Sequence, residues 1–164
     1  MSETETANRL HLDLPAGRVT IRLRPDLAPN HVARIRELVR QGFYDGTPFH
    51  RVIRRFMAQG GDPTGTGTGG SGQTLKAEFS NAPVTRGTCG MARTQDPDSA
   101  DSQFFICLAD APHLQGQYTV WGEVEGGMDA VDALKKAPIG RQSGLVDDPD
   151  HLVRAHLAED DGRG

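Results

Sequence analysis

The sequence is poor in cysteine and aromatic residues, and it contains no long apolar run. Its 164 residues include two cysteines, one tryptophan, two tyrosines and six phenylalanines. Two cysteines are too few for a disulfide framework, and the spacing of Cys89 and Cys107 matches no zinc site. No apolar run approaches the length that spans a bilayer. These absences argue against a disulfide-stabilised scaffold, a structural zinc domain and a transmembrane helix.

The sequence also lacks an excess of basic residues, with 18 Lys and Arg against 22 Asp and Glu. The formal net charge is −4 at pH 7, and acidic residues are concentrated near both ends of the chain. A surface for nucleic acid or for an anionic membrane needs a basic excess, so we expect neither partner. Residues 1–6 are acidic and polar rather than basic and apolar, which argues against a secretory signal. The expected location is therefore cytoplasmic.

Glycine and proline, by contrast, are plentiful, with 20 and 10 copies. Such a composition is typical of a fold with many turns rather than of a helical bundle. The length favours one domain with a core that needs no disulfide or metal. We expect this domain to occupy residues 9–158, between disordered tails at 1–8 and 159–164.

Apolar residues recur at the strand period over much of the chain. Residues 10–14 and 19–23 alternate between apolar and polar side chains on either side of a turn, which predicts a β-hairpin. Further short strands are expected at residues 49–53, 57–59, 88–92, 103–108, 118–124 and 152–157. Many short strands without β–α–β alternation favour a mainly β, antiparallel barrel or sandwich.

Two segments have the helical period instead. Residues 31–41 place an apolar stripe after Asn30, a suitable N-cap, and before Gly42, which suits the C′ position. A second helix is expected over residues 128–136, with Pro138 stopping it. We expect both helices to cap the β-structure.

A glycine-rich loop holds six glycines within residues 60–70. Residues 65–70 fit the dinucleotide pattern G-x-G-x-x-G, but residues 71–74 are a poor helix start, and no Lys-Ser/Thr pair follows for a phosphate-binding loop. A loop rich in left-handed backbone positions is the favoured interpretation. A dinucleotide-binding oxidoreductase is kept only as a remote alternative.

Side chains that carry bond-breaking chemistry are sparse. The histidines, at 11, 31, 50, 113, 151 and 156, have no metal-ligand spacing, so no metal site is expected. Cys107 lies in the apolar run 104–108 and is predicted to be a core residue rather than a nucleophile. Ser99 and Ser102 have no nearby histidine and aspartate to form a triad. Hydrolase chemistry therefore has little support.

One arginine lies close to a group of apolar and amide side chains. Taken alone, Arg51 is best interpreted as a solvent-facing residue whose stem covers apolar neighbours. Phe56 and Met57 cannot both face the interior of a regular strand, however, and Gln59 shares a face with Met57. One of the two apolar residues is thus expected to line a surface next to polar groups.

Six blocks, in order along the chain, resemble the signature segments of the cyclophilin family of peptidyl-prolyl cis/trans isomerases. They are FHRVI at 49–53, FMAQGGDP at 56–63, GTGG at 67–70, MA at 91–92, SQFFI at 102–106 and VWGEV at 120–124. The resemblance runs from about residue 10 to residue 137. It implies a closed eight-stranded antiparallel β-barrel capped by two α-helices, with neither cofactor nor metal.

The resemblance also implies roles for individual residues. Arg51 is the implied catalytic residue, with Gln59 and Phe56 as its catalytic neighbours. The implied substrate-binding residues are Met57, Ala92, Arg93, Gln103, Phe105, His113, Leu114 and Tyr118. Within this set the apolar side chains would surround the proline ring, and the glutamines would hold the arginine and the substrate backbone. Residues 92–93 match the stretch that pairs with the extended peptide through its main chain.

Three positions depart from the commonest pattern of the family. Arg55 stands where glycine usually precedes the phenylalanine, so a left-handed turn there would strain the arginine by about 1 kcal/mol. His113 replaces a frequent tryptophan that is associated with tight cyclosporin binding, which predicts only weak binding of that ligand. Tyr118 replaces a frequent histidine at the pocket edge, where its hydroxyl can make a similar hydrogen bond.

The implied substrates are proline-containing peptides and unfolded protein clients, bound by a monomer that assists protein folding. The alternative is a non-catalytic prolyl-peptide binding or chaperone module, which would keep the pocket without accelerating rotation. Arg51 favours the enzyme, because binding a proline ring needs apolar walls more than it needs a charge.

Overall fold

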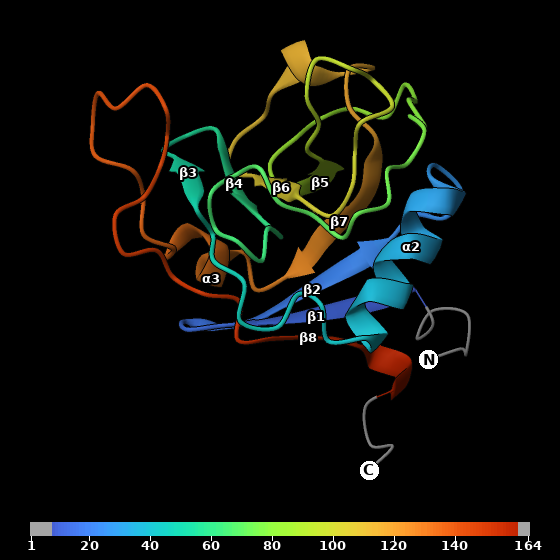
Figure 1. Cartoon of the computed structure of the whole chain (residues 1–164), viewed down its shortest axis with the longest axis horizontal. Coiled ribbons are helices and arrows are strands. Elements are labelled where there is room, and N and C mark those ends of the chain that lie inside the picture. The colour runs from blue at the N-terminus through green and yellow to red at the C-terminus, as the bar shows by residue number, and fades with distance from the viewer. Residues whose placement is uncertain (1–7, 161–164) are drawn as a thin grey trace.

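The computed structural model describes residues 8–160 as a mainly β fold (Figure 1). Eight strands form one antiparallel sheet. The strands are β1 (Arg9–Leu14), β2 (Gly17–Leu23), β3 (Arg51–Ile53), β4 (Met57–Gly60), β5 (Thr88–Met91), β6 (Phe104–Cys107), β7 (Val120–Gly126) and β8 (Arg154–Leu157). The helices are α2 (Pro29–Arg40) and α3 (Met128–Asp132), and two 3-10 turns are η1 (Pro112–Leu114) and η2 (Ala158–Asp160). Neither α-helix in this part of the chain combines the length and the apolar character that a membrane crossing requires.

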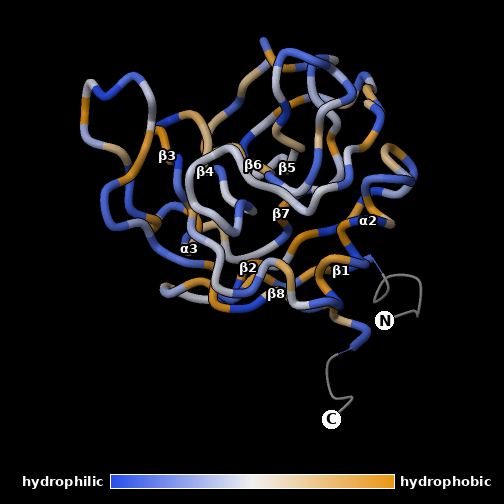
Figure 2. Tube along the Cα trace, in the orientation of Figure 1, coloured by the Kyte–Doolittle hydropathy of each residue, from blue (hydrophilic) through white to orange (hydrophobic). Residues whose placement is uncertain are grey.

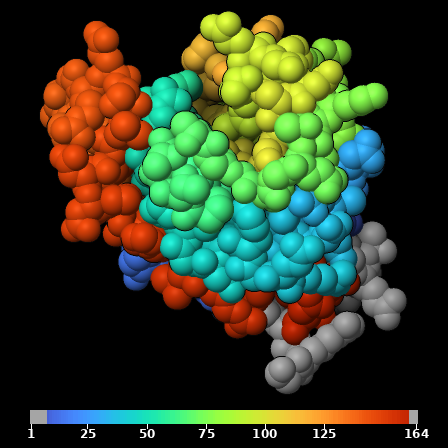
Figure 3. Space-filling model, viewed as in Figure 1, coloured from blue at the N-terminus to red at the C-terminus, as the bar shows by residue number. Residues whose placement is uncertain are grey.

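The sheet curls but does not close. The strand order β3-β4-β6-β5-β7-β2-β1-β8 leaves β3 and β8 as edges, and within residues 8–160 no ladder joins them. The expected closed barrel is therefore wrong, and the fold is an open, curled sheet. The edge strand β3 has only three residues, so it offers few backbone groups for pairing. The loop 137–151 bonds to this edge, and the Val52 N–H donates to the Gly144 carbonyl at 3.1 Å. In Figure 3 this loop, in orange, forms a lobe beside β3.

The N-terminal hairpin agrees with its predicted pattern. In β1 and β2, Leu12 pairs with Val19 and Leu14 with Gly17, so a two-residue turn joins the strands. Alternate residues of β1 are buried between half-buried ones, and β2 buries every second residue from Val19 onward. Burial of one face of the hairpin therefore specifies its register.

Helix α2 begins two residues earlier than predicted, and Asn30 does not cap it. The missing cap comes from the carboxylate of Glu78, which accepts the N–H groups of Asn30 at 3.2 Å and His31 at 2.8 Å. The Nδ1 atom of the His31 ring lies 2.6 Å from the same carboxylate. Burial raises the pKa of Glu78, but these hydrogen bonds together lower it below the usual value. A cap that comes from a distant loop leaves no local signal in the sequence.

The C-terminal end of α2 agrees with the prediction, whereas the C-terminal end of α3 does not. Gly42 follows α2 at the C′ position with φ of 73°, as expected, because glycine enters the left-handed region without strain. Helix α3 ends at Asp132 rather than at residue 136. The chain therefore leaves the helix well before Pro138.

The apolar side chains divide between a main core and a smaller cluster. In the main core, the ring of Phe104 meets Trp121 and Phe49 edge to face, with centroid distances of 6.1 and 6.0 Å. Figure 2 shows apolar colours on the strands and on α2, and polar colours on many outer loops. The smaller cluster contains Met57, Val84, Phe105, Cys107, Ala111 and Val120. Burial raises the pKa of the Cys107 thiol to about 12, so this residue belongs to the core, as predicted.

Residues 159 and 160, which we expected to belong to the C-terminal tail, are attached to α2. Glu159 and Asp160 belong to η2, and both bind arginines of α2: Arg40 lies 2.8 Å from Glu159 and 3.1 Å from Asp160, and Arg36 also pairs with Glu159. These ion pairs hold residues that we expected to be frayed. At the other end, the carbonyl of Asn8 accepts the N–H of Leu23. The rest of the expected tails, 1–7 and 161–164, lies outside the described residues.

Arg55 adopts a left-handed conformation in the turn between β3 and β4, with φ of 59°. The strain predicted for this position therefore applies. Replacing it by glycine, Arg55→Gly, is expected to raise the free energy of unfolding by about 0.5–1 kcal/mol, because relief of strain exceeds the extra freedom of the unfolded chain. Urea unfolding measures the change. Arg55→Ala is the control, since it removes the side chain and keeps the strain; a glycine variant no more stable than the alanine variant would refute the prediction.

Candidate active site

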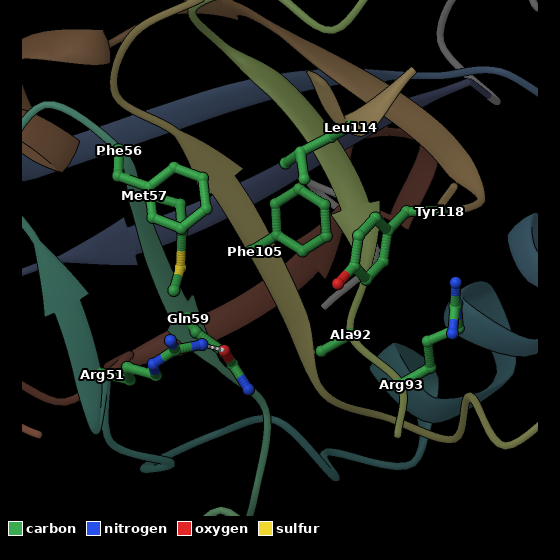
Figure 4. Close-up of a pocket in the computed structure, with 9 residues that line it drawn as sticks. All are labelled: Arg51, Phe56, Met57, Gln59, Ala92, Arg93, Phe105, Leu114 and Tyr118. Atoms are coloured by element: carbon green, nitrogen blue, oxygen red, sulfur yellow. Dashed lines mark hydrogen bonds between the residues drawn. The ribbon is translucent and has the colours of Figure 1, made fainter. Parts of the chain in front are cut away.

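A pocket of about 110 Å³ opens beside strands β3, β4 and β6 (Figure 4). Its lining residues are Arg51, Phe56, Met57, Gln59, Ala92, Arg93, Phe105, Leu114 and Tyr118. All nine belong to the set that the sequence singled out. The two remaining predicted residues, Gln103 and His113, lie just outside the lining and contact members of it. The structure thus brings together residues that are up to 67 positions apart, from Arg51 to Tyr118.

Strand pairing sets the central part of this site. Strands β3, β4 and β6 are neighbours, with Arg51 opposite Gln59 and Gln59 opposite Phe105. Directly paired residues present their side chains to the same face of a sheet, so this register gathers a guanidinium, an amide and an aromatic ring. Phe56 comes from the turn between β3 and β4, and Leu114 comes from η1.

The aromatic wall of the pocket is fixed from two sides. The Phe105 ring meets Tyr118 edge to face, with centroids 5.4 Å apart and planes at 84°. Behind the ring, a Cβ atom at Gly90 would lie 2.4 Å from Cζ of Phe105, so only glycine leaves room for the ring there. Met57 lies beside this ring in Figure 4 and is 3% exposed. The apolar surface is therefore formed before any ligand arrives.

Neutral oxygens orient the guanidinium of Arg51. Its Nε–H donates to the carbonyl of Ser143 at 3.0 Å, and its Nη1–H donates to Oε1 of Gln59 at 3.3 Å. Among residues 8–160, no carboxylate forms an ion pair with this arginine. The side chain is held in place while its positive charge stays unneutralised at the pocket.

The two glutamines form a chain of hydrogen bonds away from the arginine. Nε2 of Gln59 donates to Oε1 of Gln103 at 2.9 Å. Nε2 of Gln103 donates in turn to the carbonyls of Gly67 at 2.9 Å and Gly69 at 3.0 Å. Gln103 therefore contacts Gln59 from outside the pocket and links it to the glycine-rich loop.

The remaining predicted residues take different positions at the rim. The exposed ring of His113 stacks on Phe56, with centroids 5.9 Å apart. The Arg93 guanidinium lies over the Tyr118 ring, 4.9 Å from its centroid, and donates to the carbonyl of Gln117 at 2.7 Å. The N–H of Ala92 already donates to the Gln103 carbonyl at 2.9 Å. Arg93 thus contributes its side chain to the site, and not only its main chain.

Sequence reasoning missed Ser143, which holds Arg51 from behind through a carbonyl. A backbone acceptor carries no side-chain signature, and the two residues are 92 positions apart. It also missed Phe79, whose ring lies 5.6 Å from the Arg93 guanidinium. Phe79 lies outside every helix and strand, and its 43% exposure is visible only in the structure.

The chemistry available to this pocket is that of a fixed cationic donor beside an apolar hollow. Within residues 8–160, no group of three or more His, Cys, Asp or Glu side chains is placed to hold a metal ion. No helix begins between Gly70 and η1, so the glycine loop lacks the helix that a dinucleotide site requires, and that alternative is wrong. The arrangement suits a ligand with a compact apolar ring next to a group that accepts a hydrogen bond.

Comparison with known proteins assigns the chain that carries this site to a family. A family model described as "Cyclophilin type peptidyl-prolyl cis-trans isomerase/CLD" matches residues 8–156. The chain belongs to the cyclophilin family. It is a peptidyl-prolyl cis/trans isomerase, as the resemblance of its signature blocks implied.

Proteins similar to this cyclophilin come from several organisms. A Brucella suis protein named "Probable peptidyl-prolyl cis-trans isomerase" is 50% identical over 97% of this chain and 87% of its own. Peptidyl-prolyl cis-trans isomerase B of Bacillus subtilis is 46% identical over 76% of this chain and 88% of its own. A solved Cryptosporidium parvum cyclophilin, crystallised in the presence of the dipeptide Ala-Pro, has a TM-score of 0.83 at 28% identity, covering 91% of this chain and 98% of its own. These likenesses extend over the whole fold rather than over the site alone.

Gly144 offers a way to disturb Arg51 from behind without touching the pocket. A Cβ atom there would lie 3.1 Å from Cγ of Arg51 and 2.7 Å from Cγ1 of Ile53, whereas a Cβ at Gly140 meets nothing within 4 Å. Both glycines have positive φ, 73° and 88°, so alanine strains the backbone at either position. Gly144→Ala is expected to lower kcat/KM on the order of tenfold relative to Gly140→Ala, since small displacements of a side chain that lines an active site are costly.

The measurement is an isomerase assay on an Ala-Pro peptide, with both variants checked for equal folded fractions. Equal activity of the two alanine variants would show that the loop 137–151 does not hold the arginine in its working position.

Proposed function

We propose that Arg51 is the catalytic residue of this isomerase and that the apolar pocket beside it holds the proline ring of the substrate. The observation that supports this proposal is a guanidinium oriented by two neutral oxygens at the edge of the hollow lined by Phe56, Met57 and Phe105. Within residues 8–160, its Nη2 group makes no hydrogen bond and is therefore free to donate to a ligand.

Rotation about an Xaa-Pro bond is slow because it destroys amide resonance. The barrier is about 18–20 kcal/mol, and unassisted rotation takes tens to hundreds of seconds. When the bond is twisted by a quarter turn, the proline nitrogen regains a lone pair. A donor aimed at that nitrogen stabilises the twisted imide more than either planar isomer, and this difference accelerates the reaction. Arginine suits the role because it stays charged and presents its donors in a rigid fork.

The donor alone does not account for the acceleration expected of such an enzyme. A rate increase of about 10⁵ requires the barrier to fall by roughly 7 kcal/mol. One preorganised donor typically contributes roughly 3–4 kcal/mol. The remainder is assigned to the pocket, which grips the ring between Phe105, Met57 and Leu114 while the flanking carbonyl swings. Rotation breaks no bond, so the proposed step uses no nucleophile.

The proposed substrates are proline-containing peptides and unfolded protein clients. The Cryptosporidium parvum structure with Ala-Pro supports the peptide class, since that protein shares this fold. In the same proposal, Gln59, Gln103 and residues 92–93 position the substrate backbone, and the Tyr118 hydroxyl donates at the pocket edge. We further propose a cytoplasmic, monomeric enzyme that assists protein folding. No comparison favours a non-catalytic binding module.

Removing the guanidinium separates catalysis from binding. Arg51→Ala is expected to lower kcat/KM on the order of 10²- to 10³-fold, because the donor to the twisted imide is lost. Peptide affinity should change by a factor of about three or less, since the apolar walls remain. A protease-coupled assay gives the rate, and titration with a non-hydrolysed peptide gives the affinity.

Arg51→Lys is the matched variant, because it keeps the charge and loses the fork. A rate intermediate between alanine and wild type supports the role of the fork. Wild-type activity in Arg51→Ala would contradict the proposed mechanism.

Cyclosporin is expected to bind weakly. His113 stacks on Phe56 at the place where a tryptophan is associated with tight binding in the family, and its small, exposed ring offers less apolar area. Inhibition titrations should give a constant above the nanomolar range, and His113→Trp should lower it. A nanomolar constant for the unaltered chain would disprove this expectation.

A further inference from the structure

The carboxylate of Asp62 is the buried anchor of the glycine-rich loop. It follows β4 directly and is 0% exposed. It accepts the backbone N–H groups of Thr64 at 2.8 Å, Gly67 at 2.7 Å and Gly69 at 3.1 Å, and also the Thr64 hydroxyl at 2.7 Å. Burial raises the pKa of Asp62, but these four bonds outweigh it and lower the pKa to about 2. The carboxylate is therefore ionised at neutral pH.

Glycine is needed for this loop to wrap the carboxylate. Gly67 has φ of 91°, a conformation that other residues rarely adopt. At Gly69 a Cβ atom would lie 2.2 Å from Oδ1 of Asp62, so any side chain there would displace the carboxylate. The glycines thus allow two backbone N–H groups to point inward at one anion.

With those N–H groups turned inward, the carbonyls of the same loop face the active site. The carbonyls of Gly67 and Gly69 both accept from Nε2 of Gln103, at 2.9 and 3.0 Å. Both N–H bonds of that amide are then occupied by acceptors, so its oxygen faces Gln59 rather than the loop.

The orientation of the Gln103 amide also sets the orientation of the Gln59 amide next to Arg51. Because Oε1 of Gln103 accepts from Nε2 of Gln59, the Gln59 amide turns its own oxygen, and not its NH₂ group, toward Arg51. If the two amides flipped, the NH₂ group of Gln59 would face the guanidinium. Both groups are donors, so no hydrogen bond could form between Gln59 and Arg51. The loop carbonyls therefore determine whether Arg51 has an acceptor at Nη1.

We propose that Asp62 is a positioning residue for the isomerase reaction: it fixes the loop carbonyls that orient Gln103 and Gln59, and so holds the catalytic guanidinium. The proposal rests on the proposed role of Arg51. Asp62 itself touches no substrate, and it acts only through the loop and the two amides.

The test is a kinetic cycle on the full chain. Asp62→Asn replaces one accepting oxygen by an NH₂ group facing backbone N–H donors, which releases part of the loop. We expect kcat to fall on the order of tenfold, with peptide affinity unchanged because the pocket walls are intact. In a Gln103→Ala background the same substitution should lower kcat no further, because the connection to Arg51 is already removed. Equal losses in both backgrounds would overturn the proposal.

Glu78→Gln is the control for a purely structural effect. It also removes a carboxylate that binds backbone N–H groups, but those groups belong to α2. We expect a comparable fall in Tm with kcat unchanged. If Asp62→Asn loses no more activity than Glu78→Gln at the same loss of Tm, Asp62 has only a structural role and the proposal fails.

Gly69→Ala and Arg51→Ala distinguish failure of the positioning role from failure of the proposed function. Should Asp62→Asn not fold, Gly69→Ala displaces the same carboxylate from the loop and takes its place in the cycle. Loss of activity in Arg51→Ala together with full activity in the Asp62 and Gly69 variants removes the positioning role alone. Full activity in Arg51→Ala removes the proposed function, and the positioning role with it.

Discussion

In the proposed mechanism Arg51 aims at a neutral nitrogen, so it has to be oriented without being neutralised, and this constraint explains most of the site. A carboxylate partner would fix Arg51 firmly, but it would also occupy the fork and cancel the charge that the twisted imide needs. The structure instead uses the carbonyl of Ser143 and the amide oxygen of Gln59. Neutral acceptors are weaker individually, so each requires its own support. That support reaches back to the loop 137–151 on one side and to the glycine-rich loop on the other.

The open edge of the sheet also helps to orient Arg51 through a neutral acceptor. A closed barrel would pair β3 with β8, and the ladder would occupy the backbone groups of residues 51–53. Because, within residues 8–160, β8 forms a ladder with β1 alone, the loop 137–151 lies along β3 and brings the Ser143 carbonyl to Arg51. Gly144 makes this approach possible, since a Cβ atom there would lie 3.1 Å from Cγ of Arg51 and 2.7 Å from Cγ1 of Ile53. The departure from the expected barrel is thus connected to the way the arginine is held.

Local pattern was sufficient for the features whose cause is local. Alternation in β1 and β2 indicated the hairpin, and the glycine after α2 indicated its end. The family resemblance supplied the lining of the pocket, and nine of its eleven residues line it. Contacts between distant segments could not be predicted, because neither partner alone is unusual. The cap that Glu78 supplies to α2 is one such contact, and the Ser143 carbonyl behind Arg51 is another.

The most direct measurement is a crystal structure of the chain with a blocked tetrapeptide that contains a central Ala-Pro bond. The account predicts the proline ring against Phe105 and Met57, with a guanidinium N–H of Arg51 within hydrogen-bond distance of the prolyl nitrogen. It also predicts that the Gln59 and Ser143 contacts of the arginine persist in the complex. A guanidinium turned to solvent, with the prolyl nitrogen facing no donor, would contradict the account.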